Sequence, residues 1–334
     1  MDPPAVRLRA DIATIAMHAL EHPMSGPTVD LAGSAPPPDW GVGIDDAALA
    51  RLATRLADHH FAPASYEYEG TPDFTGEDWG RFVVLGVSVV WRLWPPAGQA
   101  MWAVRADGRR VEDAPGIWTC FARAPHSIDL EWIAEGGLGG DFFAGEGSLQ
   151  DVPRRVARLR AVAEALVEHH RGSVIGMIEQ AGGEALVLRD LVADTIPGYL
   201  DRPSSPAGTL PFDKLANLAV TMLAARLPVH GTDRFPVFPD YMLPRHLRHA
   251  GVLVYSSDLA AVVDGGRLLE PDSTEEMAIR WATIRSAEML RLALGDLGNP
   301  VATPDLDYWL WSEAVLGPRA AAMGPHHLCM TEAY

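Results

Sequence analysis

The sequence is poor in lysine, in cysteine and in positive charge. Of its 27 basic residues only Lys214 is a lysine, and the acidic residues outnumber them to give a formal net charge of −17. Proteins that grip duplex DNA or a long RNA normally present a basic surface, so this balance argues against such partners and against an anionic membrane surface. Two cysteines, Cys120 and Cys329, are too few for a disulfide framework or a cysteine zinc site.

Long apolar runs and targeting segments are also missing. The longest apolar run, residues 82–91, is too short to span a bilayer as a helix. The N-terminal region is interrupted by charged residues such as Asp11 and Glu21 and lacks the apolar core of a secretory signal. We therefore expect a soluble, cytoplasmic protein.

Helical periodicity dominates what is present. A helix is expected to begin after Asp45, and helical spacing of apolar residues continues from Asp151 onward. No internal repeat or heptad pattern divides the chain. We predict one mostly α-helical domain over residues 1–334, with an N-terminal extension over about residues 1–45.

A short β element interrupts this helical pattern. A hairpin is predicted to turn at Asp107-Gly108, and residues 117–123 fit a third strand, which places a small β element at about residues 99–123. The apolar segment at residues 81–94 fits either a buried helix or a strand.

Residues 235–259 show a helix-hairpin-helix pattern with an aspartate at its start. Gly251 permits a left-handed turn between the two helices, and Asp240 immediately precedes the first of them. The commoner role for such an aspartate is an N-cap that accepts backbone N–H bonds. The functional alternative is a carboxylate held rigidly at a helix start, where it can stabilise a cationic transition state.

Lys214 lies upstream of this hairpin, at the flank of a helix with an apolar stripe. There its stem can be buried while its ammonium enters a cleft. One explanation for a single lysine among so many arginines is compositional bias. The other is a function that arginine cannot provide, such as binding a phosphate through a compact charge or acting as a reactive amine. A lysine-bearing helix, a hairpin and an aspartate occur in the same order in helix-hairpin-helix DNA glycosylases, which suggests N-glycosidic chemistry.

Asp307 stands beside three aromatic residues on the last predicted helix. Core packing is the commoner role for such a group, but an acid next to aromatic faces also suits a flat polar base with a cationic substituent. His59 and His60 most often indicate core histidines. The remaining adjacent histidine pairs lack metal-ligand spacing, and no phosphate-binding or dinucleotide-binding loop is found, so we predict no metal and no cofactor.

At these residues the sequence resembles the queuosine salvage protein family. The resemblance runs from about His59 to Tyr334 and is strongest in FPVFPDYMLPRHLRHAGVLVYSSDL, EEMAIRWATIRSAEML, LDYWLWSEA and HHLCMTEAY. The resemblance implies release of queuine, a 7-deazaguanine base with an aminomethyl-cyclopentenediol arm, from queuosine 5′-monophosphate. The other product is ribose 5-phosphate, and the implied fold is similar to that of helix-hairpin-helix DNA glycosylases. The implied partner is this small nucleotide rather than DNA or intact tRNA.

The resemblance also implies roles for individual residues. Asp240 matches the catalytic aspartate of the family. The matching substrate-binding positions are His59, Lys214, Phe238, Asp307 and Tyr308. Phe238 is expected to pack against the base, Asp307 and Tyr308 to recognise it, and Lys214 to bind the phosphate. Ser312 stands where the family has an acid, and a serine can still hydrogen-bond a hydroxyl of the diol arm.

Two other functions remain compatible with these residues. A non-catalytic protein that binds queuine or a 7-deazaguanine nucleotide needs the aromatic and acidic pocket but no chemistry from Asp240. A nucleic-acid glycosylase fits the hairpin pattern, but the negative charge of the chain disfavours it.

Overall fold

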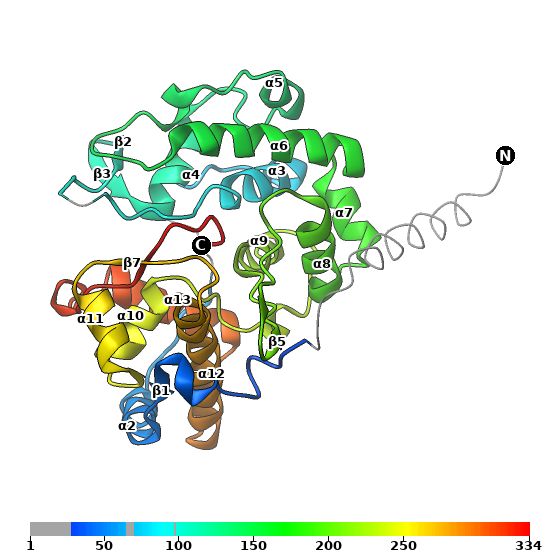
Figure 1. Cartoon of the computed structure of the whole chain (residues 1–334). Helices are drawn as coiled ribbons and strands as arrows, with labels where there is room; N and C mark the ends of the chain where they lie inside the picture. The colour runs from blue at the N-terminus through cyan, green and yellow to red at the C-terminus, as the bar shows by residue number, and fades with distance from the viewer. Residues whose placement is uncertain (1–27, 65–69, 97) are drawn as a thin grey trace.

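The computed structural model describes residues 28–64, 70–96 and 98–334 (Figure 1). The predicted N-terminal extension is therefore described only from residue 28, and its earlier part lies outside the described residues. The α-helices are α2 (Asp46–Leu56), α3 (Gly76–Val87), α4 (Asp113–Arg123), α5 (Leu130–Ala134), α6 (Val152–His170), α7 (Val174–Gln180), α8 (Ala185–Thr195), α9 (Lys214–Ala224), α10 (Met242–His249), α11 (Ser257–Asp264), α12 (Thr274–Asp296) and α13 (Thr303–Val315).

The strands are few and short, so the expectation of a mostly helical protein is confirmed. They are β1 (Val42–Ile44), β2 (Ala103–Ala106), β3 (Arg109–Glu112), β4 (Ser204–Ser205), β5 (Gly208–Thr209), β6 (Leu253–Tyr255), β7 (Leu268–Leu269) and β8 (Leu328–Cys329). Within the described ranges they form four two-stranded sheets, of which β1–β6, β2–β3 and β4–β5 are antiparallel and β7–β8 is parallel. Short 3-10 helices span Pro38–Trp40, Gly140–Phe143, Thr232–Arg234 and Ala320–Ala322.

The helices form two groups, each around its own hydrophobic cluster (Figure 1). The first cluster is contributed mainly by α3 to α9 and includes Trp79, Phe82 and Trp118. The second joins α2, β1 and β6 to α10, α11, α12 and α13. In Figure 1 the helices α3 to α6 lie above and α2 with α10 to α13 below, and α9 lies between them.

Local sequence explains how α2 begins and which face it buries. The Asp45 side chain accepts a hydrogen bond of 2.7 Å from the backbone nitrogen of Ala48, which caps the helix as expected. Leu49, Leu52 and Leu56 recur at helical spacing and are buried in the second cluster. The sequence-based prediction of this helix is confirmed.

The third strand predicted at residues 117–123 is wrong, because this segment is helical and belongs to α4. The hairpin before it is present as β2 and β3. Pro115 lies in the first turn of α4, where a proline is tolerated, and Ile117 and Phe121 both pack into the first cluster. Burial against α3 therefore overrides the strand preference of β-branched and aromatic residues. The apolar run that fitted a helix or a strand is helical up to Val87.

The two helices predicted on either side of Gly251 are present, with a short strand between them. α10 is followed by Gly251 with a φ of +76°, then by β6 and α11. The Ser256 side chain caps α11 by accepting a hydrogen bond from the backbone nitrogen of Leu259. β6 pairs with β1, so Val42 lies opposite Tyr255 and the chain entering α2 is joined to the hairpin.

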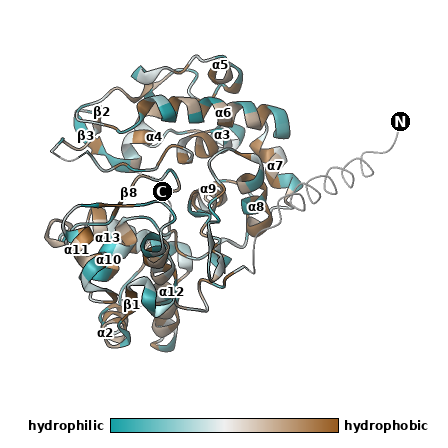
Figure 2. Cartoon of the chain, in the orientation of Figure 1, coloured by the Kyte–Doolittle hydropathy of each residue, from teal (hydrophilic) through white to brown (hydrophobic). Residues whose placement is uncertain are grey.

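Hydrophobic and hydrophilic residues alternate along the helices of both groups (Figure 2). This pattern is typical of helices that bury one face against a core and expose the other to water. None of the helices in the described ranges is both long enough and apolar enough to cross a bilayer.

Candidate active site

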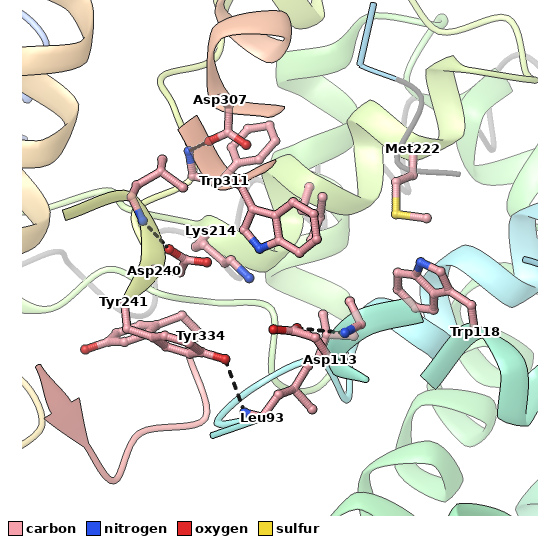
Figure 3. A pocket seen from close by; sticks show the side chains of 15 residues that line it. Leu93, Asp113, Trp118, Lys214, Met222, Asp240, Tyr241, Asp307, Trp311 and Tyr334 are labelled. Atoms are coloured by element: carbon pink, nitrogen blue, oxygen red, sulfur yellow. Dashed lines mark hydrogen bonds between the residues drawn. The ribbon is translucent and has the colours of Figure 1, made fainter. Parts of the chain in front are cut away.

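Residues from both hydrophobic clusters line a cavity between the two groups of helices (Figure 3). They come from the loop after α3, the first turns of α4, one face of α9, the segment that enters α10, and α13 together with Tyr334. Most of them are apolar or aromatic. Four carry charges and share the cavity: Asp113, Lys214, Asp240 and Asp307.

Asp240 is held at the start of α10 by the helix backbone. Its Oδ1 accepts hydrogen bonds from the backbone nitrogens of Met242 at 2.7 Å and Leu243 at 3.0 Å. The side chain thus caps the helix and lines the cavity at the same time. Burial raises the pKa of the Asp240 carboxyl, while the Lys214 ammonium and the backbone donors counteract part of this rise.

Lys214 begins α9 and is the one basic residue among the described residues that line the cavity. Its ammonium lies between Asp240 and Asp113 in Figure 3. Burial lowers the pKa of Lys214, and the carboxylates of Asp240, Asp307 and Asp113 oppose this shift. A compact, partly desolvated ammonium in such a site can bind an anionic group such as a phosphate.

Asp307 and Phe238 are joined directly. The Asp307 Oδ1 accepts a hydrogen bond of 2.6 Å from the backbone nitrogen of Phe238, and both residues are buried. This bond connects α13 to the segment before α10. It therefore fixes the backbone at Phe238, which lies two positions before Asp240 in the sequence. The four residues predicted at Lys214, Phe238, Asp240 and Asp307 are therefore brought together.

The other predicted positions do not line this cavity. The His59 ring packs against the rings of Phe61 and Trp309, with centroid separations of 4.8 and 5.5 Å. Tyr308 packs against the first hydrophobic cluster. The Ser312 Oγ is buried and has no hydrogen-bond partner among the described residues.

Several lining residues were not predicted from the sequence, among them Asp113, Trp118, Tyr241 and Tyr334. Tyr241 and Tyr334 lie within the family-like segments, so their neighbours in sequence offered a signal. Tyr241 accepts a hydrogen bond of 3.3 Å from the backbone nitrogen of Leu93, which ties it to the loop after α3. Asp113 and Trp118 carried no such signal, because their segment was expected to be β structure.

Arg280 contacts Tyr334, which lines the cavity, and its guanidinium is already paired with protein groups. Its guanidinium forms an ion pair with Asp201, lies 3.6 Å from a Glu276 carboxylate oxygen and stacks on the Tyr334 ring. The Tyr334 hydroxyl donates a hydrogen bond of 2.7 Å to Glu276. These contacts hold Tyr334 in place at the cavity and, among the described residues that line it, leave Lys214 as the cation available to a ligand.

Among the described residues, no three histidine, cysteine, aspartate or glutamate side chains lie together in a way that could hold a metal ion. The charged groups among the described residues that line the cavity are three carboxylates and one ammonium, and aromatic side chains lie around them. A site of this kind suits a flat, polar ligand that carries an anionic group.

The chain is similar to one protein family and to several named proteins. Residues 142–334, more than half of the chain, match the family model described as queuosine salvage protein. A protein of Sphaerobacter thermophilus named queuosine 5′-phosphate N-glycosylase/hydrolase is 26% identical over 310 residues, covering 88% of this chain and 93% of its own length. The protein of the same name from Mus musculus is 28% identical over 229 residues, covering 64% of this chain and 65% of its own length. The chain belongs to the queuosine salvage protein family.

Proposed function

We propose that the chain hydrolyses the N-glycosidic bond of queuosine 5′-monophosphate and releases queuine and ribose 5-phosphate. Relatives named for this activity support the proposal, one of them over 88% of the chain. The structural observation that supports it best is the meeting of Lys214, Phe238, Asp240 and Asp307 in one cavity, although they come from separate segments.

Asp240 is the proposed catalytic residue. Cleavage of the C–N bond gives the sugar oxocarbenium character, which a nearby carboxylate stabilises. The same carboxylate can orient and deprotonate the attacking water. Because Met242 and Leu243 hold the carboxylate in one orientation, no reorganisation is required as positive charge develops.

The remaining polar groups of the cavity are assigned to substrate binding. Lys214 is proposed to bind the phosphate, and Phe238 to pack against the base. A 7-deazapurine lacks the ring nitrogen through which ordinary purines are activated by protonation, so contacts to its other polar edges gain importance. Asp307 is proposed to make such a contact. For His59, Tyr308 and Ser312, substrate binding remains a prediction.

We also propose a fold, a size of substrate and a cellular location for this protein. The succession of α10, Gly251 and α11 supports a helix-hairpin-helix fold similar to that of DNA glycosylases, in one domain with an N-terminal extension. The net charge of −17 supports a small nucleotide substrate rather than DNA or intact tRNA. Cys120 and Cys329 are free and buried, which fits a reducing, cytoplasmic location.

The direct test is incubation of the purified, metal-free protein with queuosine 5′-monophosphate, followed by mass spectrometry. We expect queuine and ribose 5-phosphate to appear together. Asp240→Asn keeps an acceptor for the α10 backbone but removes the negative charge, so turnover should fall by at least about 10³-fold while the nucleotide still binds. Asp258→Asn, at an exposed position of α11, is the matched control and should retain full activity.

One result would contradict the proposed reaction, and another would contradict the role of Asp240. Tight binding of the intact nucleotide without product would favour the non-catalytic binding protein. Full activity of Asp240→Asn would remove Asp240 from the mechanism and leave the overall reaction in place.

A further inference from the structure

A second carboxyl group, that of Asp113, faces the cavity from the wall opposite Asp240 (Figure 3). Asp113 is the first residue of α4 and its exposed fraction is 7%. Trp118 and Ala114, also from α4, line the cavity beside it, and Leu218 and Met222 of α9 line the same cavity. The carboxyl group is therefore buried, with several apolar side chains around the same cavity.

The backbone at Asp113 adopts an uncommon conformation. Its φ is +57°, in the left-handed region that most residues with a side chain avoid. Aspartate and asparagine tolerate this region better than other such residues. Strained positions of this kind occur often at functional sites, where the surrounding structure holds them in place. Here the unusual φ belongs to the residue whose carboxyl lines the cavity.

The two carboxyl groups have different surroundings. Asp240 is capped by two backbone donors and lies beside Lys214. Asp113 accepts one hydrogen bond, 2.7 Å from the backbone nitrogen of Ala114, and it feels the negative charge of Asp240 as well as the positive charge of Lys214. Tyr241 also faces it. Burial raises the pKa of Asp113 to about 6.

Hydrolysis of the proposed substrate requires a proton donor for the departing base, and neither Asp240 nor Lys214 has been assigned that role. The base must depart with the electron pair of the glycosidic bond, and a neutral leaving base requires a proton. A buried carboxyl group whose pKa is raised toward the working pH is a suitable donor.

We propose that Asp113 is a second catalytic residue, which in its protonated form donates a proton to the base while the glycosidic bond breaks. The inference rests on the proposed function. The C1′–N bond breaks with its electron pair going to the base, and the proton of the Asp113 carboxyl moves to the base. Water forms the new C1′–O bond and passes a proton to Asp240. Asp240 then releases a proton to solvent, and Asp113 takes one up from solvent, so both groups return to their starting states.

The pH dependence of the wild-type protein tests this role without a mutation. Only the protonated form of Asp113 can act, so kcat/KM for queuosine 5′-monophosphate, which reports the ionisation of the free enzyme, should fall about tenfold per pH unit above a pH near 6. A 4-nitrophenyl riboside 5-phosphate has a leaving group that needs no proton. With that substrate, the alkaline decrease should be absent.

Asp113→Asn supplies the second arm of the test. Asparagine tolerates the left-handed backbone and its amide oxygen can still accept from Ala114, so the fold should be retained. We expect kcat for queuosine 5′-monophosphate to fall by about 10²- to 10⁴-fold, and kcat for the nitrophenyl substrate by less than about threefold. Glu112→Gln, at the exposed neighbouring position, is the control and should match the wild type.

The possible failures can be told apart. If the wild type releases no queuine, the proposed function fails and Asp113 is not at issue. If the wild type is active but Asp113→Asn lowers kcat equally for both substrates, or raises only KM, the acid role is overturned. An unchanged alkaline decrease in Asp113→Asn would overturn it as well.

Discussion

Lys214 combines three properties that are rarely found in one residue. It is the single lysine of the chain, it is buried, and it lies among three acidic side chains at the start of α9. Burial alone disfavours an ammonium, and the neighbouring carboxylates counteract this effect. A bound phosphate dianion would stabilise the charged form of Lys214 further, because it adds negative charge next to the ammonium.

Lys214→Ala should raise KM for queuosine 5′-monophosphate by about 10- to 100-fold, the range of one charge-assisted hydrogen bond. KM for unphosphorylated queuosine should change by less than about threefold, because that nucleoside has no group for Lys214 to bind. Steady-state kinetics with both compounds measures the difference. Arg267→Ala, which removes an exposed cation elsewhere, is the control. An equal loss with both compounds would contradict the phosphate role.

At the scale of the elements, the shape of the cavity depends on the close approach of α3 and α4. A Cβ atom added to Gly86 of α3 would lie 2.8 Å from Cζ3 of Trp118, which lines the cavity from α4. That separation is shorter than a normal carbon contact, so the absence of a side chain at Gly86 allows Trp118 to occupy its position. Glycine here serves packing rather than a turn, since its backbone is helical.

Gly86→Ala should therefore lower the free energy of unfolding by about 1–3 kcal/mol, as overpacking in a core usually does. Because Trp118 must shift toward the cavity, KM for the nucleotide should rise as well. Urea denaturation and steady-state kinetics measure the two effects. Gly295→Ala, at an exposed helical position of α12 with open space around it, should leave KM unchanged and stabilise the protein by up to about 1 kcal/mol. A Gly86→Ala protein as stable and active as the wild type would refute this packing role.

At the scale of the whole molecule, two hydrophobic clusters meet at the cavity, and the chain that surrounds it carries a net charge of −17. Self-repulsion of this kind favours solubility and opposes association with polyanions. Among the described residues that line the cavity, Lys214 supplies the one ammonium, which can contact a single phosphate group. This arrangement suits a mononucleotide far better than a polynucleotide.

The charge leads to a prediction about intact tRNA. At low salt, where electrostatic attraction is strongest, tRNA should bind more weakly than about 10⁻⁴ M, the weak limit of ordinary non-specific binding. Gel-shift titration at several salt concentrations measures this. Queuosine 5′-monophosphate in the same buffer is the control and should bind. Retardation of tRNA that weakens as salt is added would show a polynucleotide surface and revive the glycosylase alternative.

Elements that depend on contacts between residues close together in the sequence could be predicted from the sequence. The cap and apolar spacing of α2, the turn at Gly251 and the hairpin of β2 and β3 were all predictable. They depend on contacts between residues a few positions apart, such as the hydrogen bond between Asp45 and Ala48. The third strand failed because α4 acquires its conformation from burial against α3, which no local pattern records.

By itself the sequence determined the helical character of this protein, its negative charge, and the segments that mark its family, including those that carry Asp240 and Asp307. Only the tertiary structure decided which of the marked residues share a cavity, and that Asp113 and Trp118 join them. It also placed His59 outside that cavity, against Phe61 and Trp309. The physical reason is that a site between two groups of helices depends on packing between distant segments, whereas composition and local spacing describe each segment alone.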